Sequence, residues 1–251
     1  NNETMKYSMP KWLQFLAKRF PGIRKNIANL DEVKIADHCE FDGVNFQFDS
    51  RVMDKKRFVA IAAGALESDE VKVAQRFLKK DDIVVEFGSG LGIAAARVNK
   101  VVGPKQHYCF EANPLVIEYA QKLFELNQIQ IKIENVALGN GTPLPFYMVD
   151  DYILSSFQKP KGRDDWQQVD VPTIKCQEVV TSLKPTVIFC DIEGAELEYL
   201  DAQNYESVRK IVVELHPEIY GIDGVRHYYK RMENHGFKCR MRKGDTHCFI
   251  R

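Results

Sequence analysis

The sequence lacks long apolar runs, a signal-like apolar core in its opening residues, and an excess of charge of either sign. No stretch approaches the roughly 20 apolar residues that cross a membrane, and the opening NNETMKYSMP has no apolar signal core. The chain has 35 Lys and Arg against 35 Asp and Glu, so no overall charge attracts nucleic acid or an acidic membrane. We therefore predict a soluble, cytoplasmic protein with no membrane span and no nucleic-acid partner. Its first residue is Asn rather than Met, which suggests a truncated or processed N-terminus.

Closely paired cysteines are also missing. The six cysteines are scattered and none forms a CxxC pair. Histidine lies near cysteine at positions 38–39, 107–109 and 247–248, but a structural zinc site normally has tighter cysteine pairs. The spacing predicts free thiols in a reducing compartment.

Two kinds of pattern divide the chain. Within residues 1–60, the apolar pattern of Lys11–Phe20 predicts an amphipathic helix, and a weak alternation over 37–48 around Asp42-Gly43 predicts a hairpin. We interpret them as an extension that packs on or caps the main domain, residues 61–251.

The main domain alternates helical and strand patterns, which predicts an α/β fold with a parallel sheet and helices on both faces. Its last two strands are expected to form an antiparallel hairpin around the turn Lys243-Gly244-Asp245. The predicted strands are Ile83–Phe87, His107–Glu111, Ile129–Asn135, Thr186–Asp191, Lys210–Leu215, Phe237–Met241 and His247–Ile250. The predicted helices begin at or near Glu67, Ile93, Pro114, Cys176, Gly194 and Val225.

A glycine-rich turn, GSGLG, follows the first of these parallel strands. Its spacing is GxGxG, whereas a dinucleotide-binding turn has its third glycine one place later, where this chain has Ile93. Glu86, just before the turn, would oppose a pyrophosphate but suits the amino or sulfonium side of S-adenosylmethionine. A tight turn with no ligand is the structural alternative.

Two more polar residues end neighbouring strands. Glu111 can accept both hydroxyls of a ribose, which supports an adenosine cofactor without choosing between S-adenosylmethionine and a dinucleotide. Asn135, followed by Val136, could border an adenine, although an isolated Asn in this place is more often a turn residue.

The segment CDIEGAELEYL places four acids at the end of the fourth parallel strand. Asp191 should lie beside the first strand, near the transferable methyl group and the acceptor, with Glu193 at the edge of the same crevice. Glu196 and Glu198 fit the first turns of a helix, where acids interact favourably with its dipole. We predict no metal, because no Asp-Asn pair follows the fifth strand to complete a magnesium shell.

His216, after the fifth strand, is a candidate general base, because a neutral imidazole titrates near working pH. Asp191 or Glu193 could instead accept the proton or orient the acceptor hydroxyl. A corner residue before proline is the structural alternative for His216.

Six motifs in this order resemble the FkbM-type family of S-adenosylmethionine-dependent methyltransferases: VVEFGSGLG, FEANP, ENVALGN, VPTI, CDIEGAELEYL and VVELHP. The similarity spans roughly residues 64 to 217. Gly64-Ala65-Leu66-Glu67 is similar to the family's Gly-x-Tyr-Glu element. Phe189 stands where the family often has a lysine, and Glu86 where many members have Asp.

The resemblance implies the class I methyltransferase fold, a Rossmann-like three-layer sandwich with a seven-stranded, mostly parallel sheet. It also implies S-adenosylmethionine as cofactor and methylation of a hydroxyl on a sugar, glycan or small natural product. The catalytic candidates are Asp191, Glu193 and His216. The predicted cofactor-binding residues are Glu67, Glu86, Gly88, Ser89, Gly90, Gly92, Glu111, Ala112, Asn135, Val136 and Asp191.

Two alternatives stay open. The first is a nicotinamide-dependent oxidoreductase, which would bind a dinucleotide at the glycine turn. The glycine spacing and the negative charge of Glu86 both count against this alternative. A non-catalytic domain could retain the cofactor fold and bind without turnover. The acceptor site is expected among residues 5–48, 150–166 and the loop after His216, where no motif is recognised.

Overall fold

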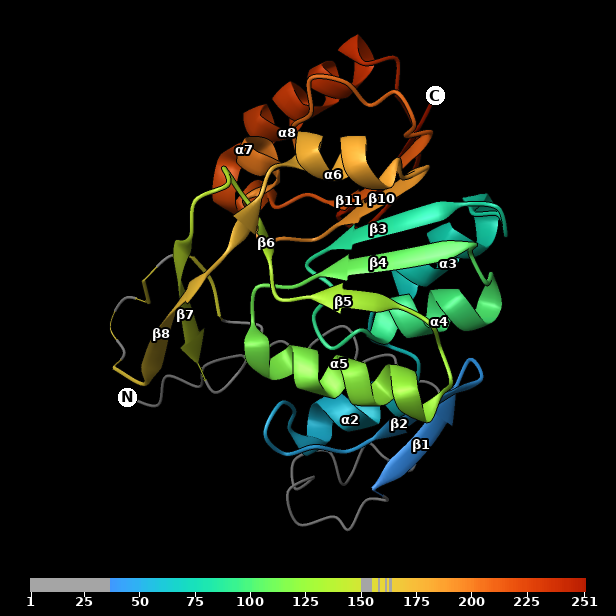
Figure 1. The fold of residues 1–251 in the computed structure, drawn as a ribbon, viewed down its shortest axis with the longest axis vertical. Helices are drawn as coiled ribbons and strands as arrows, with labels where there is room; N and C mark the ends of the chain where they lie inside the picture. Colours follow the sequence, from blue (N-terminus) through green and yellow to red (C-terminus); the bar gives the residue numbers. More distant parts are fainter. Residues whose placement is uncertain (1–36, 150–154, 158, 161, 163) are drawn as a thin grey trace, which may run out of the picture.

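A computed structural model describes residues 37–149, 155–157, 159, 160, 162 and 164–251 of the chain. Its centre is a seven-stranded sheet in the order β12-β13-β11-β10-β3-β4-β5 (Figure 1). The strands are β3 (Ile83–Phe87), β4 (Gln106–Phe110), β5 (Lys132–Glu134), β10 (Val187–Cys190), β11 (Lys210–Glu214), β12 (Lys238–Lys243) and β13 (Thr246–Ile250). Only β13 runs antiparallel to its two neighbours. This order and pairing confirm the predicted class I methyltransferase fold.

The strand order reverses between β3 and β10. From β3 the chain builds outward through β4 to β5, and it then returns to place β10 on the other side of β3. Cys190 pairs with Phe87 in parallel register, so these two strands end side by side. Ligands of open parallel sheets bind at the carboxyl ends of the strands at such a reversal.

Helices cover both faces of the sheet, which gives the predicted three layers (Figure 1). The apolar residues of β3 alternate between the faces: Val85 and Phe87 join the core under α8, whereas Val84 joins the core under α3 and α4. On one side lie α3 (Ser68–Phe77), α4 (Ile93–Val101) and α5 (Pro114–Leu126), and on the other α6 (Cys176–Leu183), α7 (Glu196–Tyr199) and α8 (Pro217–Asn234).

The predicted hairpin is confirmed. Strands β1 (His38–Phe41) and β2 (Val44–Gln47) pair across Asp42 and Gly43, whose φ angles of 53° and 73° fit a tight hairpin turn. The side chains of Val44 and Phe46 are fully buried with α2 (Lys55–Ala62), α4 and α5. The predicted helix at Lys11–Phe20 lies outside the described residues.

Three predicted boundaries are wrong. Strand β5 begins at Lys132 rather than Ile129, because the Ile129 N–H still bonds to Phe124 at the end of α5. The helix expected from Gly194 is a single turn, α7. Helix α8 begins at Pro217, eight residues before the predicted start, and continues across a kink at Gly221 (φ 69°).

Two small two-stranded sheets are formed by the part of the chain between β5 and α6. Strand β6 (Ala137–Leu138) pairs with β9 (Thr173–Ile174), and β7 (Leu144–Val149) pairs antiparallel with β8 (Trp166–Val171). Both ribbons stand apart from the main sheet (Figure 1). No helix in the described part of the chain has the length and apolar character needed to cross a membrane.

Candidate functional site

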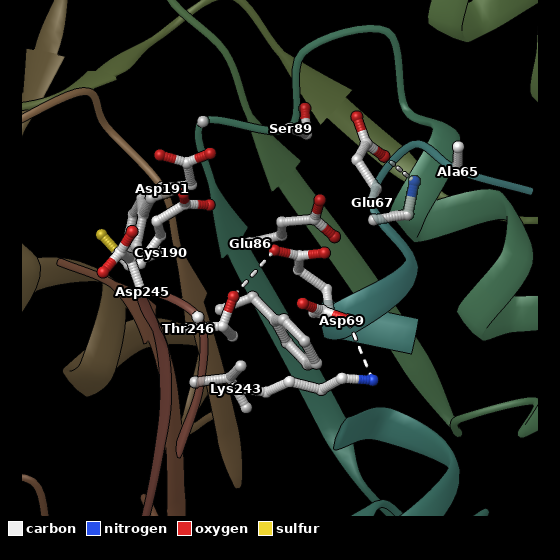
Figure 2. Close-up of a pocket in the computed structure, with 18 residues that line it drawn as sticks. Ala65, Glu67, Asp69, Glu86, Ser89, Cys190, Asp191, Lys243, Asp245 and Thr246 are labelled. Carbon is white, nitrogen blue, oxygen red and sulfur yellow. Dashed lines mark hydrogen bonds and ion pairs between the residues drawn. The ribbon is translucent and has the colours of Figure 1, made fainter. Parts of the chain in front are cut away.

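A cavity of about 270 Å³ opens at the carboxyl ends of β3, β10 and β11 (Figure 2). It lies where the strand order reverses, which is the predicted position of the ligand site. Its lining residues are Ala65, Glu67, Asp69, Glu70, Glu86, Phe87, Gly88, Ser89, Ala94, Phe189, Cys190, Asp191, Val212, Glu214, Lys243, Gly244, Asp245 and Thr246.

Acidic side chains dominate this cavity. Seven of the lining residues are Asp or Glu, and Lys243 is the only Lys or Arg among them. Figure 2 shows Lys243 reaching across to Asp69, and its Nζ lies 3.1 Å from Asp69 Oδ1. Thr246 donates a hydrogen bond of 3.2 Å to Glu70 Oε1. The cavity therefore favours a positively charged ligand and disfavours an anion.

Burial, together with neighbouring acids, raises the pKa values of Glu67, Glu214 and Asp191. Burial, followed by the charges of Glu70 and Glu86, raises the pKa of Glu67 to about 8. Burial and the charge of Glu70 raise the pKa of Glu214 to about 7, although His216 acts in the opposite direction. Burial, then Glu214 and Glu193, raises the pKa of Asp191 well above its ordinary value. A bound cation would relieve this repulsion.

The glycine turn is shaped by close backbone approaches. A Cβ on Gly88 (φ 78°) would lie 1.6 Å from the backbone oxygen of Asp191, so no side chain fits there. A Cβ on Gly92 (φ 72°) would lie 2.7 Å from the ring of Phe124. The structural explanation of the glycines therefore holds at positions 88 and 92. It is compatible with a ligand, because the same turn lines the cavity through Gly88 and Ser89.

Ser89 sits in this turn with 3% of its surface exposed. Its hydroxyl oxygen is buried and has no hydrogen-bond partner among the described residues. On the strand before the turn, Glu86 Oε2 lies 3.0 Å from His107 Nε2, which fixes the carboxylate at the cavity wall. Cys109 completes a buried group of three potential metal ligands with Glu86 and His107.

The residues predicted for ribose and adenine lie together beyond the turn. Glu111 accepts hydrogen bonds from the Gly90 N–H (2.7 Å) and the Asn113 N–H (2.8 Å), one on each oxygen. The Asn135 amide donates to the carbonyls of Glu111 and Ala112, at 3.0 and 2.9 Å. Both side chains are therefore held in place by the backbone around them.

The predicted cofactor residues form two neighbouring groups. Glu67, Glu86, Gly88, Ser89 and Asp191 line the acidic cavity. Gly90, Gly92, Glu111, Ala112, Asn135 and Val136 do not line it; they follow the turn and the ends of β4 and β5. A long ligand at the strand ends would reach both groups.

The catalytic candidates lie together after β10 and β11. His216 Nε2 is 3.7 Å from Asp191 Oδ1 and 3.5 Å from Glu193 Oε2. Its Nδ1 is 3.2 Å from Glu196 Oε1, an ion-pair distance without the alignment of a hydrogen bond. Burial alone would lower the pKa of His216, but Glu193, Glu196 and Asp191 raise it to about 11. The imidazole is therefore protonated at neutral pH, which does not fit the predicted neutral base.

Glu196 has a different role from the one predicted. It stands in the first turn of α7, but it is fully buried, and its Oε1 accepts the N–H groups of Ile192 and Gly194, both at 3.1 Å. These bonds hold the turn at Glu193, a non-glycine residue with φ 54°. The helix-dipole explanation remains only for the exposed Glu198.

Much of the cavity wall was not predicted from the sequence. Asp69 and Glu70 come from the start of α3, and Glu214 from the end of β11. Because β13 is antiparallel, its first residue, Thr246, pairs with Glu214 and brings the preceding turn to the same edge. Glu214 stands at the end of a predicted strand, and this position is the signal by which it could have been assigned to the site from the sequence. The missed lining side chains are Asp69, Glu70, Glu214, Lys243, Asp245 and Thr246.

No family model matches the chain, and no curated protein matches its sequence. Similar solved structures include M. jannaschii TYW2 in complex with AdoMet, which is 13% identical and shares 87% of this chain and 85% of its own, with a TM-score of 0.46. Ribosomal protein L11 methylase from Lactobacillus delbrueckii subsp. bulgaricus is 13% identical over 74% of this chain and 77% of its own (TM-score 0.44). A methyltransferase from Pyrococcus furiosus is 14% identical over 93% and 98% (TM-score 0.45). Likenesses this distant assign no activity to the chain.

Proposed function

We propose that this chain is an S-adenosylmethionine-dependent methyltransferase of the FkbM type that methylates a hydroxyl on a sugar, glycan or small natural product. The acidic cavity at the strand-order reversal is the observation that carries this proposal. S-adenosylmethionine brings a sulfonium and an ammonium group, and both are attracted by the carboxylates there. The pyrophosphate of a nicotinamide dinucleotide would meet Glu86 and Asp191 at the same turn and be repelled.

The two groups of predicted residues suit the two ends of this cofactor. In the proposed arrangement the methionine end lies in the cavity, with Glu67 and Glu86 near its ammonium group and the turn from Gly88 to Gly92 beneath it. Glu111 accepts the ribose hydroxyls. Ala112, Asn135 and Val136 border the adenine, which leaves the methyl group close to Asp191.

Methyl transfer needs an acceptor oxygen in line with the methyl–sulfur bond and a group that takes the hydroxyl proton. The oxygen forms a bond to the methyl carbon, the carbon–sulfur bond breaks, and sulfur keeps the electron pair as S-adenosylhomocysteine. We assign the proton to Asp191 or Glu193, because burial and neighbouring acids make Asp191 a stronger base than usual. His216, whose Nε2 lies 3.7 Å from Asp191 Oδ1 and 3.5 Å from Glu193 Oε2, orients both carboxylates.

An Asp191→Asn variant tests this assignment. Transfer of a labelled methyl group from S-adenosylmethionine to a panel of sugar hydroxyls should lose about 100-fold or more in kcat, the usual range for removing a proton acceptor. Binding of S-adenosylhomocysteine should weaken far less. Glu198→Gln, an exposed acid in the same segment, is the matched control and should retain wild-type rates.

Failure has two distinct forms. Tight binding of S-adenosylhomocysteine with no transfer to any acceptor would favour the non-catalytic alternative. Transfer that is unchanged in Asp191→Asn would remove Asp191 from the mechanism.

Two further proposals concern the division of the chain into parts and its location in the cell. We propose the division into residues 1–60 and 61–251, with the extension packed on the core; burial of Val44 and Phe46 against α4 and α5 supports it. We also propose a cytoplasmic location. All six cysteines are free thiols, which is typical of reducing compartments.

A further inference from the structure

We propose that Asp191, Glu193 and His216 form a binding site for a divalent first-row transition-metal cation at the carboxyl ends of β10 and β11. The sequence predicted no metal, because no Asp-Asn pair follows the fifth strand. The structure supplies the missing ligand from that same place, as the imidazole of His216. One oxygen or nitrogen of each of the three residues lies within 4.8 Å of the others.

The spacing of these atoms suits ligands of one cation. Ligands about 2.1 Å from a metal stand about 3.0 Å apart at a right angle and about 3.4 Å apart in a tetrahedron. His216 Nε2 lies 3.7 Å from Asp191 Oδ1 and 3.5 Å from Glu193 Oε2. The side chain of Glu193 is 50% exposed and can close the remaining few tenths of an ångström.

The surroundings of His216 match those of a metal-bound histidine. Such a histidine usually turns its second nitrogen to a carboxylate, which fixes the ring and its tautomer. Glu196 occupies this place, 3.2 Å from Nδ1, and is itself fixed by the N–H groups of Ile192 and Gly194. The other ring nitrogen, Nε2, then faces Asp191 and Glu193, and a bound cation would take the place of the proton that Nε2 otherwise carries.

A buried carboxylate oxygen without a hydrogen bond points the same way. Asp191 Oδ1, which faces His216 Nε2 at 3.7 Å, is buried and makes no hydrogen bond to a described residue. The side chain of His216 is itself only 9% exposed. A buried polar atom of this kind is expected where an ion completes the site.

The donor set selects the class of cation. Two carboxylate oxygens and one imidazole nitrogen suit Mn²⁺, Fe²⁺ or Zn²⁺ better than Mg²⁺ or Ca²⁺, which prefer oxygen alone. Asp191 also lines the cavity proposed for the methionine end of the cofactor, so the cation would lie beside the methyl group that is transferred. Binding the acceptor hydroxyl is the expected role. This role rests on the proposed function, whereas the cation site itself does not.

A titration of the chain with MnCl₂, read by the electron paramagnetic resonance of free Mn²⁺, tests the site directly. The wild type should bind one Mn²⁺ per chain. Glu193→Gln and His216→Gln should each weaken binding about tenfold or more, because each removes a ligand. Three control variants should bind Mn²⁺ as tightly as the wild type. Glu198→Gln removes an exposed acid of the same segment, Asp69→Asn removes an acid of the cavity, and Cys109→Ser alters the buried Glu86–His107–Cys109 group.

Binding of no Mn²⁺ by the wild type, or equal binding by Glu193→Gln and the wild type, would overturn the inference. Glu193 is half exposed, so its variant keeps the readout valid even where His216→Gln fails to fold. Mn²⁺ binding without any methyl transfer would count against the proposed function alone. Full methyl transfer in EDTA, combined with no Mn²⁺ binding, would count against the cation site alone.

Discussion

At the scale of single residues, Glu67 combines a strained backbone conformation with a buried carboxylate. Its backbone is left-handed (φ 48°), and its carboxylate accepts the N–H of Ala94 at the start of α4. Non-glycine residues in this conformation are strained and cluster at functional sites. Glu193, two residues after Asp191, also has a left-handed backbone (φ 54°).

The raised pKa of Glu67 predicts a pH-dependent stability. An acid whose pKa rises from 4.5 in the unfolded chain to about 8 in the folded chain stabilises the fold below pH 4.5, and this contribution is lost as the pH rises through 8. Glu67→Gln cannot ionise, and its amide oxygen still accepts the Ala94 N–H. At pH 8.5 the variant should therefore be more stable by on the order of 2 kcal/mol.

Urea unfolding at two pH values measures this effect. The two proteins should unfold at nearly the same urea concentration at pH 4.5, and the variant should be the more stable one at pH 8.5. Glu198→Gln is the control and should show no such divergence. A wild type as stable as Glu67→Gln at pH 8.5 would contradict the burial and repulsion described for Glu67.

Gly88 gives a second prediction at this scale. Gly88→Ala places a Cβ 1.6 Å from the Asp191 carbonyl oxygen and should destabilise the fold by at least about 3 kcal/mol. Gly236→Ala is the matched control: it also has positive φ (82°), but nothing lies within 4 Å of its Cβ, so its cost should be about 1 kcal/mol. Urea unfolding gives the free energy of unfolding of both variants. An equal loss of stability in the two would show that the β3–β10 junction relaxes to accommodate a side chain at Gly88.

The sequence placed residues at the cavity where that position follows from strand and turn patterns alone. Glu86, Gly88 and Asp191 were predicted because strand ends and glycine turns are visible in a single sequence. The role of Glu196 was missed, because an acid at a helix start has a sufficient local explanation. Its actual partners, Ile192, Gly194 and His216, depend on a turn geometry that the sequence does not display.

At the scale of secondary-structure elements, the hairpin of β12 and β13 shapes the site as much as the parallel strands do. Its existence was predicted from the turn Lys243-Gly244-Asp245. Its contribution to the cavity was not, because that depends on β13 pairing antiparallel with β11 and so beginning at the ligand edge. Helix α8 shows a comparable limit: Gly221 interrupts the helical pattern, so only the part after Gly224 was predicted.

Removing the positive charge of this hairpin turn should strengthen cofactor binding. Lys243→Gln removes the only lysine or arginine side chain among the residues that line the cavity, beside its seven acids. S-adenosylmethionine should therefore bind about two- to fivefold more tightly at low salt. Lys238→Gln, exposed on the same strand, should bind as the wild type. Isothermal titration calorimetry gives both constants. Weaker binding by Lys243→Gln would mean that Lys243 holds an anionic group of the ligand instead.

At the scale of the whole molecule, the sequence predicted the sheet and its two helical layers, because the alternation of βα units and the handedness of their connections leave few arrangements. The cavity could not be predicted in the same way. Asp69, Glu214 and Asp245 are distant in sequence and meet only through packing of α3, β11 and the last hairpin. The seven acids gathered there carry the proposal of a cationic cofactor.

The stability of the folded chain in the presence of two ligands tests that proposal most directly, because a ligand bound only by the folded state raises its melting temperature. Thermal unfolding should be measured with saturating S-adenosylhomocysteine, with saturating NAD⁺ and without ligand. The proposed function predicts a clear increase in Tm with S-adenosylhomocysteine and none with NAD⁺. An increase with NAD⁺ and none with S-adenosylhomocysteine would contradict it.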